Sequence, residues 1–163
     1  LVEGDSASLA ELVALMSSIG DVPLRQDLAL TGSVDHFGHV QPVGAVNEKI
    51  EAFFDLCAAR GLDGTQGVLL PESNTPQLML RDDVVAAVAA GRFSVQAVRS
   101  VDDAMQALTG LPAGDAAVPA DGSVNGRIAR RLHEYSQLRR GEPRFLRRRA
   151  TGRVRIQVTK DAE

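Results

Sequence analysis

The sequence predicts an α/β (α+β) fold, because segments with helical and with strand periodicity alternate over its first 110 residues. Residues 7–18 carry apolar side chains at helical spacing, and so do residues 46–60. Residues 67–71 form a short apolar run that begins with Gly and ends with Pro, which is typical of a buried strand. Because only 4% of the residues are aromatic while 44% are hydrophobic, we expect an aliphatic core.

Each element follows from a local signal. The first helix, residues 7–18, has Asp5 or Ser6 as its candidate N-cap, and Gly20 ends it. Next we expect a hairpin, since apolar residues flank a turn that contains Asp and Gly. The predicted elements after the first helix are a strand at 27–34, a turn at 35–38, a strand at 39–43, a helix at 46–60, a strand at 67–71, helices at 75–80 and 82–90, a strand at 93–98 and a helix at 101–108.

Charge divides the chain into two regions. Residues 1–115 hold 6 basic and 16 acidic side chains, whereas residues 116–163 hold 12 basic and 5 acidic ones. Residues 111–126 are rich in Gly, Ala, Pro and Asp, so we interpret them as a linker. The domain prediction is therefore a body at 1–110, a linker at 111–126 and a basic extension at 127–163. Within the extension, a basic helix is expected at 128–138 and an edge strand at 153–158.

Composition limits the classes of function. No apolar run approaches the length of a membrane span, so no membrane partner is predicted. Cys57 is the single cysteine, which fits a reducing, cytoplasmic location. The three histidines and one cysteine show no metal-ligand spacing, and we expect no metal. The chain starts with Leu rather than Met, so we expect a piece of a longer protein.

Lys49 is the candidate general base. It is the only lysine in the first 159 residues of a chain that has sixteen arginines and one other lysine, Lys160, and it lies in an apolar helical stripe. Lysine can lose its proton when it is buried, whereas arginine in practice cannot. The alternative is a lysine whose stem lies along the apolar face while its ammonium group reaches water.

Ser6 is the candidate nucleophile, because a serine hydroxyl at a helix N-terminus lies beside backbone N–H groups that can stabilise an oxyanion. A simple helix cap is the alternative. Thr31 can orient the Lys49 amine, or it is an ordinary strand threonine. Glu3 and Asp5 can tune the serine environment, or they only complement the helix dipole.

Four blocks of sequence stand out: residues 3–8 (Glu-Gly-Asp-Ser-Ala-Ser), 30–34 (Leu-Thr-Gly-Ser-Val), 41–49 (Gln-Pro-Val-Gly-Ala-Val-Asn-Glu-Lys) and 67–71 (Gly-Val-Leu-Leu-Pro). In their order and spacing they resemble the proteolytic domain of Lon proteases, and most of all a bacterial branch of Lon-related ATP-dependent proteases. The resemblance covers roughly residues 1–110 and implies a Lon-type proteolytic domain fragment with a basic C-terminal extension.

The resemblance also implies residue roles. Ser6 takes the place of the nucleophile, Lys49 that of the dyad lysine, and Thr31 that of a threonine near the lysine. Glu3 stands where many members have Asp. Gly44 and Ala45 replace a common Gly-Gly pair. A Ser-Lys dyad requires the Ser6 hydroxyl and the Lys49 amine to approach each other, with Thr31 near the amine.

The implied function is a serine endopeptidase that cleaves unfolded or damaged proteins or peptides, as a homo-oligomer that is a hexameric ring in the family. Bond cleavage needs no cofactor. ATP and Mg would serve an ATPase region outside this chain, which has no phosphate-binding loop motif. The alternative is a non-catalytic assembly or nucleic-acid-binding module that acts through the Arg-rich extension. For that extension we favour docking on an acidic body over nucleic-acid binding.

Overall fold

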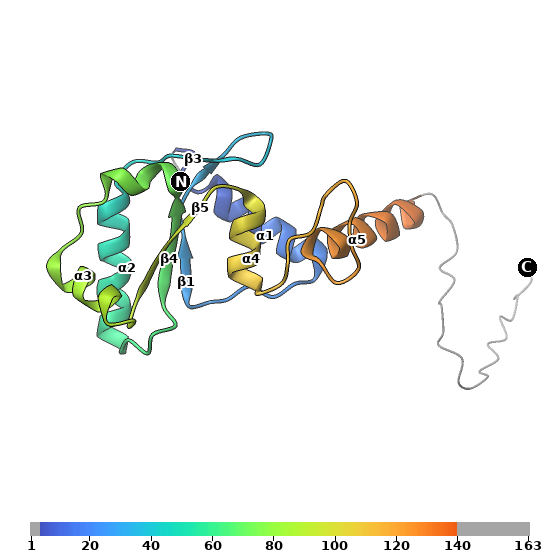
Figure 1. The fold of residues 1–163 in the computed structure, drawn as a ribbon. Coiled ribbons are helices and arrows are strands. Elements are labelled where there is room, and N and C mark those ends of the chain that lie inside the picture. The colour runs from blue at the N-terminus through green and yellow to red at the C-terminus, as the bar shows by residue number, and fades with distance from the viewer. Residues whose placement is uncertain (1–3, 140–163) are drawn as a thin grey trace, which may run out of the picture.

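The computed structural model describes residues 4–139, which form a three-layer α/β structure. A parallel sheet lies in the middle, with α2 (Val46–Arg60) and α3 (Asp82–Ala89) on one side and α1 (Ser8–Gly20) and α4 (Val101–Thr109) on the other (Figure 1). Helix α5 (Val124–Arg139) lies beyond α1 and α4 (Figure 1). The predicted α/β class is confirmed.

The central sheet contains three parallel strands in the order β1-β4-β5. Strand β4 (Gly67–Pro71) is in the middle, so every one of its residues is buried. Strands β1 (Leu28–Leu30) and β5 (Ser94–Val98) pair with it at either edge. A strand that is covered on both faces explains why residues 67–71 are a continuous apolar run rather than an alternating one.

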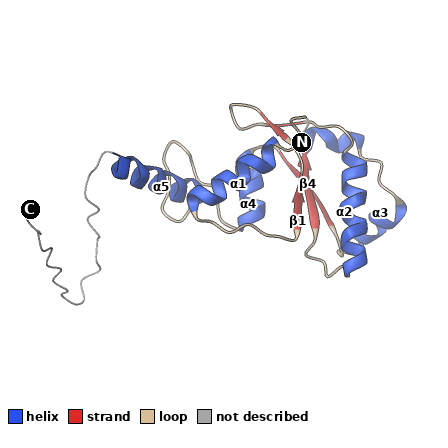
Figure 2. Ribbon diagram, turned by 180° about the vertical axis from the view of Figure 1, so that it is seen from behind, coloured by secondary structure: helices blue, strands red, loops and turns tan. Residues whose placement is uncertain are grey.

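Two apolar clusters fill the spaces on either side of the sheet. Because side chains alternate along a strand, Val68 and Leu70 join one cluster and Leu69 joins the other. The first cluster packs α2 (Val46–Arg60) and α3 (Asp82–Ala89) against the sheet. The second packs α1 (Ser8–Gly20) and α4 (Val101–Thr109) on the opposite face, as the view from behind shows (Figure 2).

The strand predicted at 27–34 is in fact two strands. Residues 28–30 belong to the parallel sheet, whereas β2 (Ser33–Val34) leaves it and pairs antiparallel with β3 (Val40–Gln41). The chain changes direction at Gly32, where a Cβ would lie 2.8 Å from Leu9 of α1. The predicted hairpin is present, but its first strand is shorter because α1 approaches the backbone at this glycine.

The helix predicted at 75–80 is also wrong in position and type. Residues 72–77 form a short 3₁₀ helix, η1 (Glu72–Gln77), and Leu78 is already extended, with ψ 122°. Pro76 has no N–H to donate and restricts the backbone of the preceding residue, so an α-helix centred there is disfavoured.

The segment expected as a linker packs against the body. Ala113, Ser123 and Val124 are buried, and the backbone N–H of Val124 donates to the Pro112 carbonyl at 3.1 Å. Helix α5 (Val124–Arg139) then lies against α1, where Ile128 covers Gly20. The expected strand at 153–158 lies outside the described residues.

Candidate functional site

The serine of the candidate dyad lies in the turn before α1. The Ser6 carbonyl accepts a hydrogen bond from the Gly32 N–H at 3.0 Å, and the Gly32 carbonyl accepts one from the Leu9 N–H at 3.2 Å. These two bonds join the serine turn to the chain just after β1. Since a Cβ at position 32 would also lie 3.1 Å from Val40, only glycine fits this close approach without displacement.

Two neighbours of Ser6 add side-chain bonds to the same segment. The Ser33 hydroxyl donates to the Asp5 carboxylate at 2.8 Å. The Ser8 hydroxyl accepts from the Val34 N–H at 3.2 Å. The acid and the second serine of the Gly-Asp-Ser-Ala-Ser block therefore hold the turn against β2. The sequence interpretation gave Asp5 only a local role and gave Ser8 none.

The lysine lies in the first turn of α2. Ala45, which precedes the helix, has a left-handed conformation with φ 56° and ψ 36°. Its carbonyl accepts the Lys49 N–H at 3.1 Å, so this turn sets where the helix begins. A left-handed alanine costs about 1 kcal/mol relative to glycine. In the Gly44-Ala45 pair, the alanine is therefore the residue at the position that needs a positive φ.

Thr31 connects the two halves of the site. Lys49 Nζ donates to the Thr31 hydroxyl at 3.3 Å, and this hydroxyl donates to the Ser6 carbonyl at 3.4 Å. Thr31 is 7% exposed, while Lys49 and Ser6 are half-buried. The threonine thus links the lysine amine with the backbone of the serine, across three separate elements.

Ser6, Thr31 and Lys49 line one hollow of about 280 Å³. The other lining residues are small or apolar: Ala7, Ala10, Ala29, Leu30 and Val68. The structure brings these three predicted residues together, and their catalytic roles stay predictions. Glu3 lies outside the described residues.

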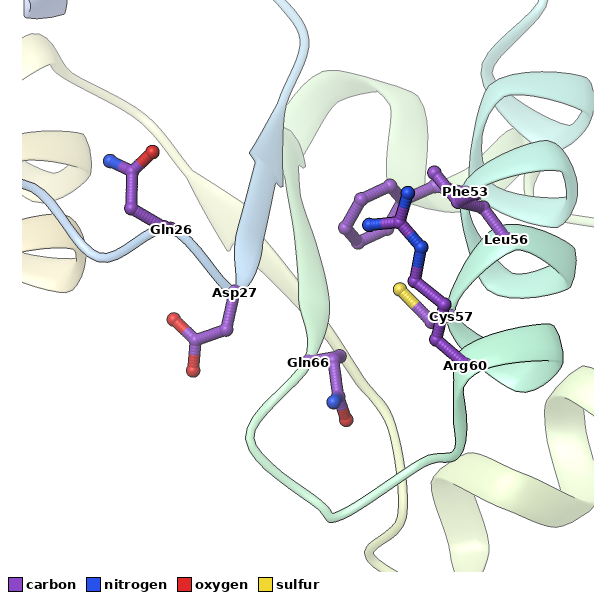
Figure 3. A pocket seen from close by; sticks show the side chains of 7 residues that line it. All are labelled: Gln26, Asp27, Phe53, Leu56, Cys57, Arg60 and Gln66. Atoms are coloured by element: carbon purple, nitrogen blue, oxygen red, sulfur yellow. The ribbon is translucent and has the colours of Figure 1, made fainter.

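A second hollow, of about 350 Å³, lies at the C-terminal end of α2 (Figure 3). Its walls come from α2 and from the chain before β1 and β4, and its lining is Gln26, Asp27, Phe53, Leu56, Cys57, Arg60 and Gln66. Burial raises the pKa of the Cys57 thiol, which keeps it protonated and unreactive. Although this hollow is larger, it holds no activated nucleophile.

Asn74 is a further residue of interest that the sequence did not indicate. It follows Pro-Glu-Ser in a segment whose composition suggests only a turn. In the structure it is 1% exposed and bonds to the chain that leads into α2. A single sequence gives no signal for such a bond across 31 residues.

Between residues 4 and 139, no group of three or more His, Cys, Asp or Glu side chains is arranged to hold a metal ion. In the same range, no helix has the length and apolar character to cross a bilayer.

Comparison with known proteins identifies the family. Residues 2–110 match the Lon protease (S16) C-terminal proteolytic domain. The chain belongs to this family, and its body is a proteolytic domain of the Lon type.

Relatives agree with this assignment. The chain is 53% identical over 110 residues to a protein of Escherichia coli (strain K12) named "Putative Lon protease homolog", a match that covers 68% of this chain and 19% of that protein. A protein of the same name from Haemophilus influenzae is 49% identical over 109 residues, with 67% and 18% covered. An "Archaeal Lon protease" of Halobacterium salinarum is 36% identical over 127 residues, with 77% and 16% covered. The chain thus spans about a fifth of the length of these relatives.

Proposed function

We propose that this chain supplies the proteolytic site of a Lon-type serine endopeptidase that works with a Ser-Lys dyad. One observation carries the proposal: Ser6, Thr31 and Lys49 come from three elements, line one hollow, and are connected through Thr31. Membership of the Lon proteolytic family supports it. The larger hollow around Cys57 offers no comparable set of groups.

In the proposed reaction, the neutral Lys49 amine takes the proton of the Ser6 hydroxyl, whose oxygen attacks the scissile carbonyl. The resulting ammonium then gives the proton to the leaving amine, so that an acyl-serine forms. Water hydrolyses the acyl-serine with the amine again acting as base, which restores both residues. Thr31 accepts a hydrogen bond from the amine and thereby orients it.

The oxyanion requires backbone donors near Ser6. The N–H groups of Ser8 and Leu9 already donate within the protein, to the carbonyls of Asp5 and Gly32. We therefore assign the oxyanion donors to the earlier part of the turn, the N–H groups of Ser6 and Ala7, at the positive end of the α1 dipole.

The substrates that fit this proposal are unfolded or damaged proteins and peptides, which can enter the site as extended chains. ATP and Mg would act on unfolding and translocation in a region outside this chain, and bond cleavage itself uses no cofactor. The relatives named as Lon proteases support the proposal of protein substrates. We propose the cytoplasm as the location, because the single thiol is free and buried.

The test is Ser6→Ala in the full-length protein, with cleavage of a short fluorogenic peptide and of casein as readouts. We expect complete loss of both, with an unchanged thermal unfolding midpoint, since Ser6 is half-buried and its structural bonds use the backbone. Ser18→Ala, at an exposed position of α1, is the matched control and should keep full activity. Cleavage that survives Ser6→Ala would overturn the proposal.

For the basic extension we propose a role in homo-oligomer assembly. Leu132, Tyr135 and Leu138 form an exposed apolar stripe on α5, beside exposed arginines, in a protein whose body is acidic. Replacing all three with serine should lower the mass of the oligomer in light scattering, whereas the buried contact of Val124 stays intact. Salt-dependent DNA retention that is lost in this variant, with an unchanged oligomer, would favour the nucleic-acid alternative.

A further inference from the structure

Asn74 is a buried amide whose hydrogen bonds go to none of Ser6, Thr31 and Lys49. Of the four buried polar side chains between residues 4 and 139, it has the smallest exposed fraction, 1%. It lies in η1, directly after the central strand β4, on a segment that passes the start of α2. A buried amide is costly unless its donors and acceptor are satisfied, so its partners show what it does.

The partners of Asn74 are mainly on the backbone of Val43. Asn74 Oδ1 accepts the Val43 N–H at 2.9 Å, and Asn74 Nδ2 donates to the Val43 carbonyl at 2.9 Å. The second Nδ2 proton goes to Gln77 Oε1 at 3.2 Å. A reciprocal pair of this kind fixes both the position and the orientation of one peptide segment, because two bonds of opposite polarity must be kept together.

The segment that Asn74 holds has few other restraints. Pro42, Gly44 and Ala45 are exposed, and a Cβ at position 44 would meet no atom within 4 Å. Yet this segment must bring the chain into the left-handed turn at Ala45, whose carbonyl accepts the Lys49 N–H. Packing therefore does little to fix residues 42–45, and the Asn74 bonds supply that restraint.

Two further hydrogen bonds connect the same region to α2 one turn later. Asn47 Oδ1 accepts the Met79 N–H at 2.9 Å, and Asn47 Nδ2 donates to the Gln77 carbonyl at 3.2 Å. The η1 segment and the residues after it thus bond both to the chain that leads into α2, at Val43, and to the first turn of α2, at Asn47. Asn74 is the buried member of this set, whereas Asn47 is only half-buried.

The position of this first turn matters for the dyad. The contact between Lys49 Nζ and Thr31 Oγ1 is 3.3 Å, already near the outer range of a hydrogen bond. A shift of about 1 Å at the start of α2 would break it, and a misplacement of that size can lower a rate by about 100-fold. On the basis of the proposed function, we propose that Asn74 is a positioning residue that holds the start of the lysine helix so that the Lys49 amine meets Thr31 and Ser6.

The experiment compares four variants of the full-length protein. Asn74→Asp keeps the shape and the acceptor for the Val43 N–H but loses both donors, and Asn74→Ala loses all three bonds. Thr75→Ala removes only an exposed bond within η1, from Thr75 Oγ1 to the Glu72 carbonyl. Val84→Ala makes a cavity at a fully buried position of α3, in the same apolar layer, and serves as the control for lost stability.

Three quantities are measured at a temperature where every variant is folded: kcat, KM for a short fluorogenic peptide, and the rate at which a fluorophosphonate labels Ser6. For both Asn74 variants we expect kcat and the labelling rate to fall together, by about 10- to 100-fold, with KM within about twofold of the wild type. Thr75→Ala should match the wild type. Val84→Ala should unfold at a lower temperature and keep its kcat.

The outcomes separate the inference from the function on which it rests. If the kcat of Asn74→Asp is as high as that of the stability control Val84→Ala, Asn74 is only a structural residue and the inference is overturned. If the wild type and Ser6→Ala show the same fluorophosphonate labelling and the same peptide cleavage, the proposed function itself fails. A difference between the wild type and Ser6→Ala, together with wild-type kcat in both Asn74 variants, rejects the positioning role alone.

Discussion

The two ends of α2 each border a hollow against the sheet, but only the hollow at the N-terminal end brings together a serine, a threonine and a lysine. The hollow at the C-terminal end is the larger, about 350 Å³ against about 280 Å³. At the N-terminal end, polar groups from the serine turn, the chain just after β1 and α2 are connected through Thr31. At the other end, Arg25 donates to Asp27 at 2.6 Å in a partly exposed pair beside the hollow.

In this molecule the larger hollow is therefore not the one that gathers the predicted dyad residues. What distinguishes the smaller hollow is that its polar atoms come from separate elements and share one buried hydroxyl, that of Thr31. The ion pairs elsewhere on the described surface are solvent-exposed, and such pairs contribute little to stability. The predictions below test this contrast between the two ends of α2.

The largest effect is expected for Lys49→Arg. Arginine keeps the positive charge but cannot act as a base, so cleavage should fall by at least about 10²- to 10⁴-fold. Arg60→Lys is the matched control, since it makes the reverse exchange in the other hollow, and it should leave kcat unchanged. A Lys49→Arg variant that cleaves peptide at nearly the wild-type rate would contradict the general-base assignment.

Thr31→Val should have the next largest effect. Valine preserves the shape and the strand preference but cannot contact the amine, so kcat should fall by about 10-fold through lost orientation. The free energy of unfolding should fall by about 1 kcal/mol, because a buried hydrogen-bonded hydroxyl is removed. Thr65→Val, in the exposed loop before β4, is the comparison and should keep full activity. Equal rates for Thr31→Val and the wild type would remove Thr31 from the site.

Cys57→Ala should separate the two hollows most cleanly. We expect unchanged peptide cleavage and a loss of about 1 kcal/mol of stability, since Cys57 is 7% exposed and packs in the apolar layer beneath α2. In the native protein its raised pKa should make alkylation by iodoacetamide slow, and denaturant should accelerate it. If Cys57 in the folded protein is alkylated rapidly and peptide cleavage stops as a result, the larger hollow has a role in the activity.

The smallest effect is expected on acidification. Arg99 lowers the pKa of the Glu72 carboxyl, and Arg81 lowers that of Asp55, from ordinary values of 4.5 and 3.8. A carboxyl whose folded pKa is depressed stabilises the fold above its unfolded pKa, and this contribution is lost as the pH falls through the folded value. The unfolding midpoint should therefore decline below about pH 4. Glu72→Gln should make the unfolding midpoint slightly less dependent on pH in this range. A midpoint that rises on acidification would contradict the assignment of these pairs.

The sequence by itself determined the class of the fold, most of its helices and strands, and the candidate residues of the site. The helix at 46–60 and the strand at 67–71 follow from local periodicity and from their flanking Gly and Pro, so the structure reproduces their bounds. Ser6, Thr31 and Lys49 were singled out by residue type, position and resemblance.

Tertiary structure decided what depends on contacts between distant segments. Residues 27–34 split into two strands because α1 touches the backbone at Gly32, which no local pattern encodes. The bonds from Asp5 and Ser8 to β2, and from Asn74 to Val43, each join residues more than 25 positions apart. Local propensity reports only on neighbours in sequence, whereas a buried polar group finds its partner only when packing brings two segments together. That is why the dyad candidates were visible in the sequence, while the groups that hold them in place appeared only in the fold.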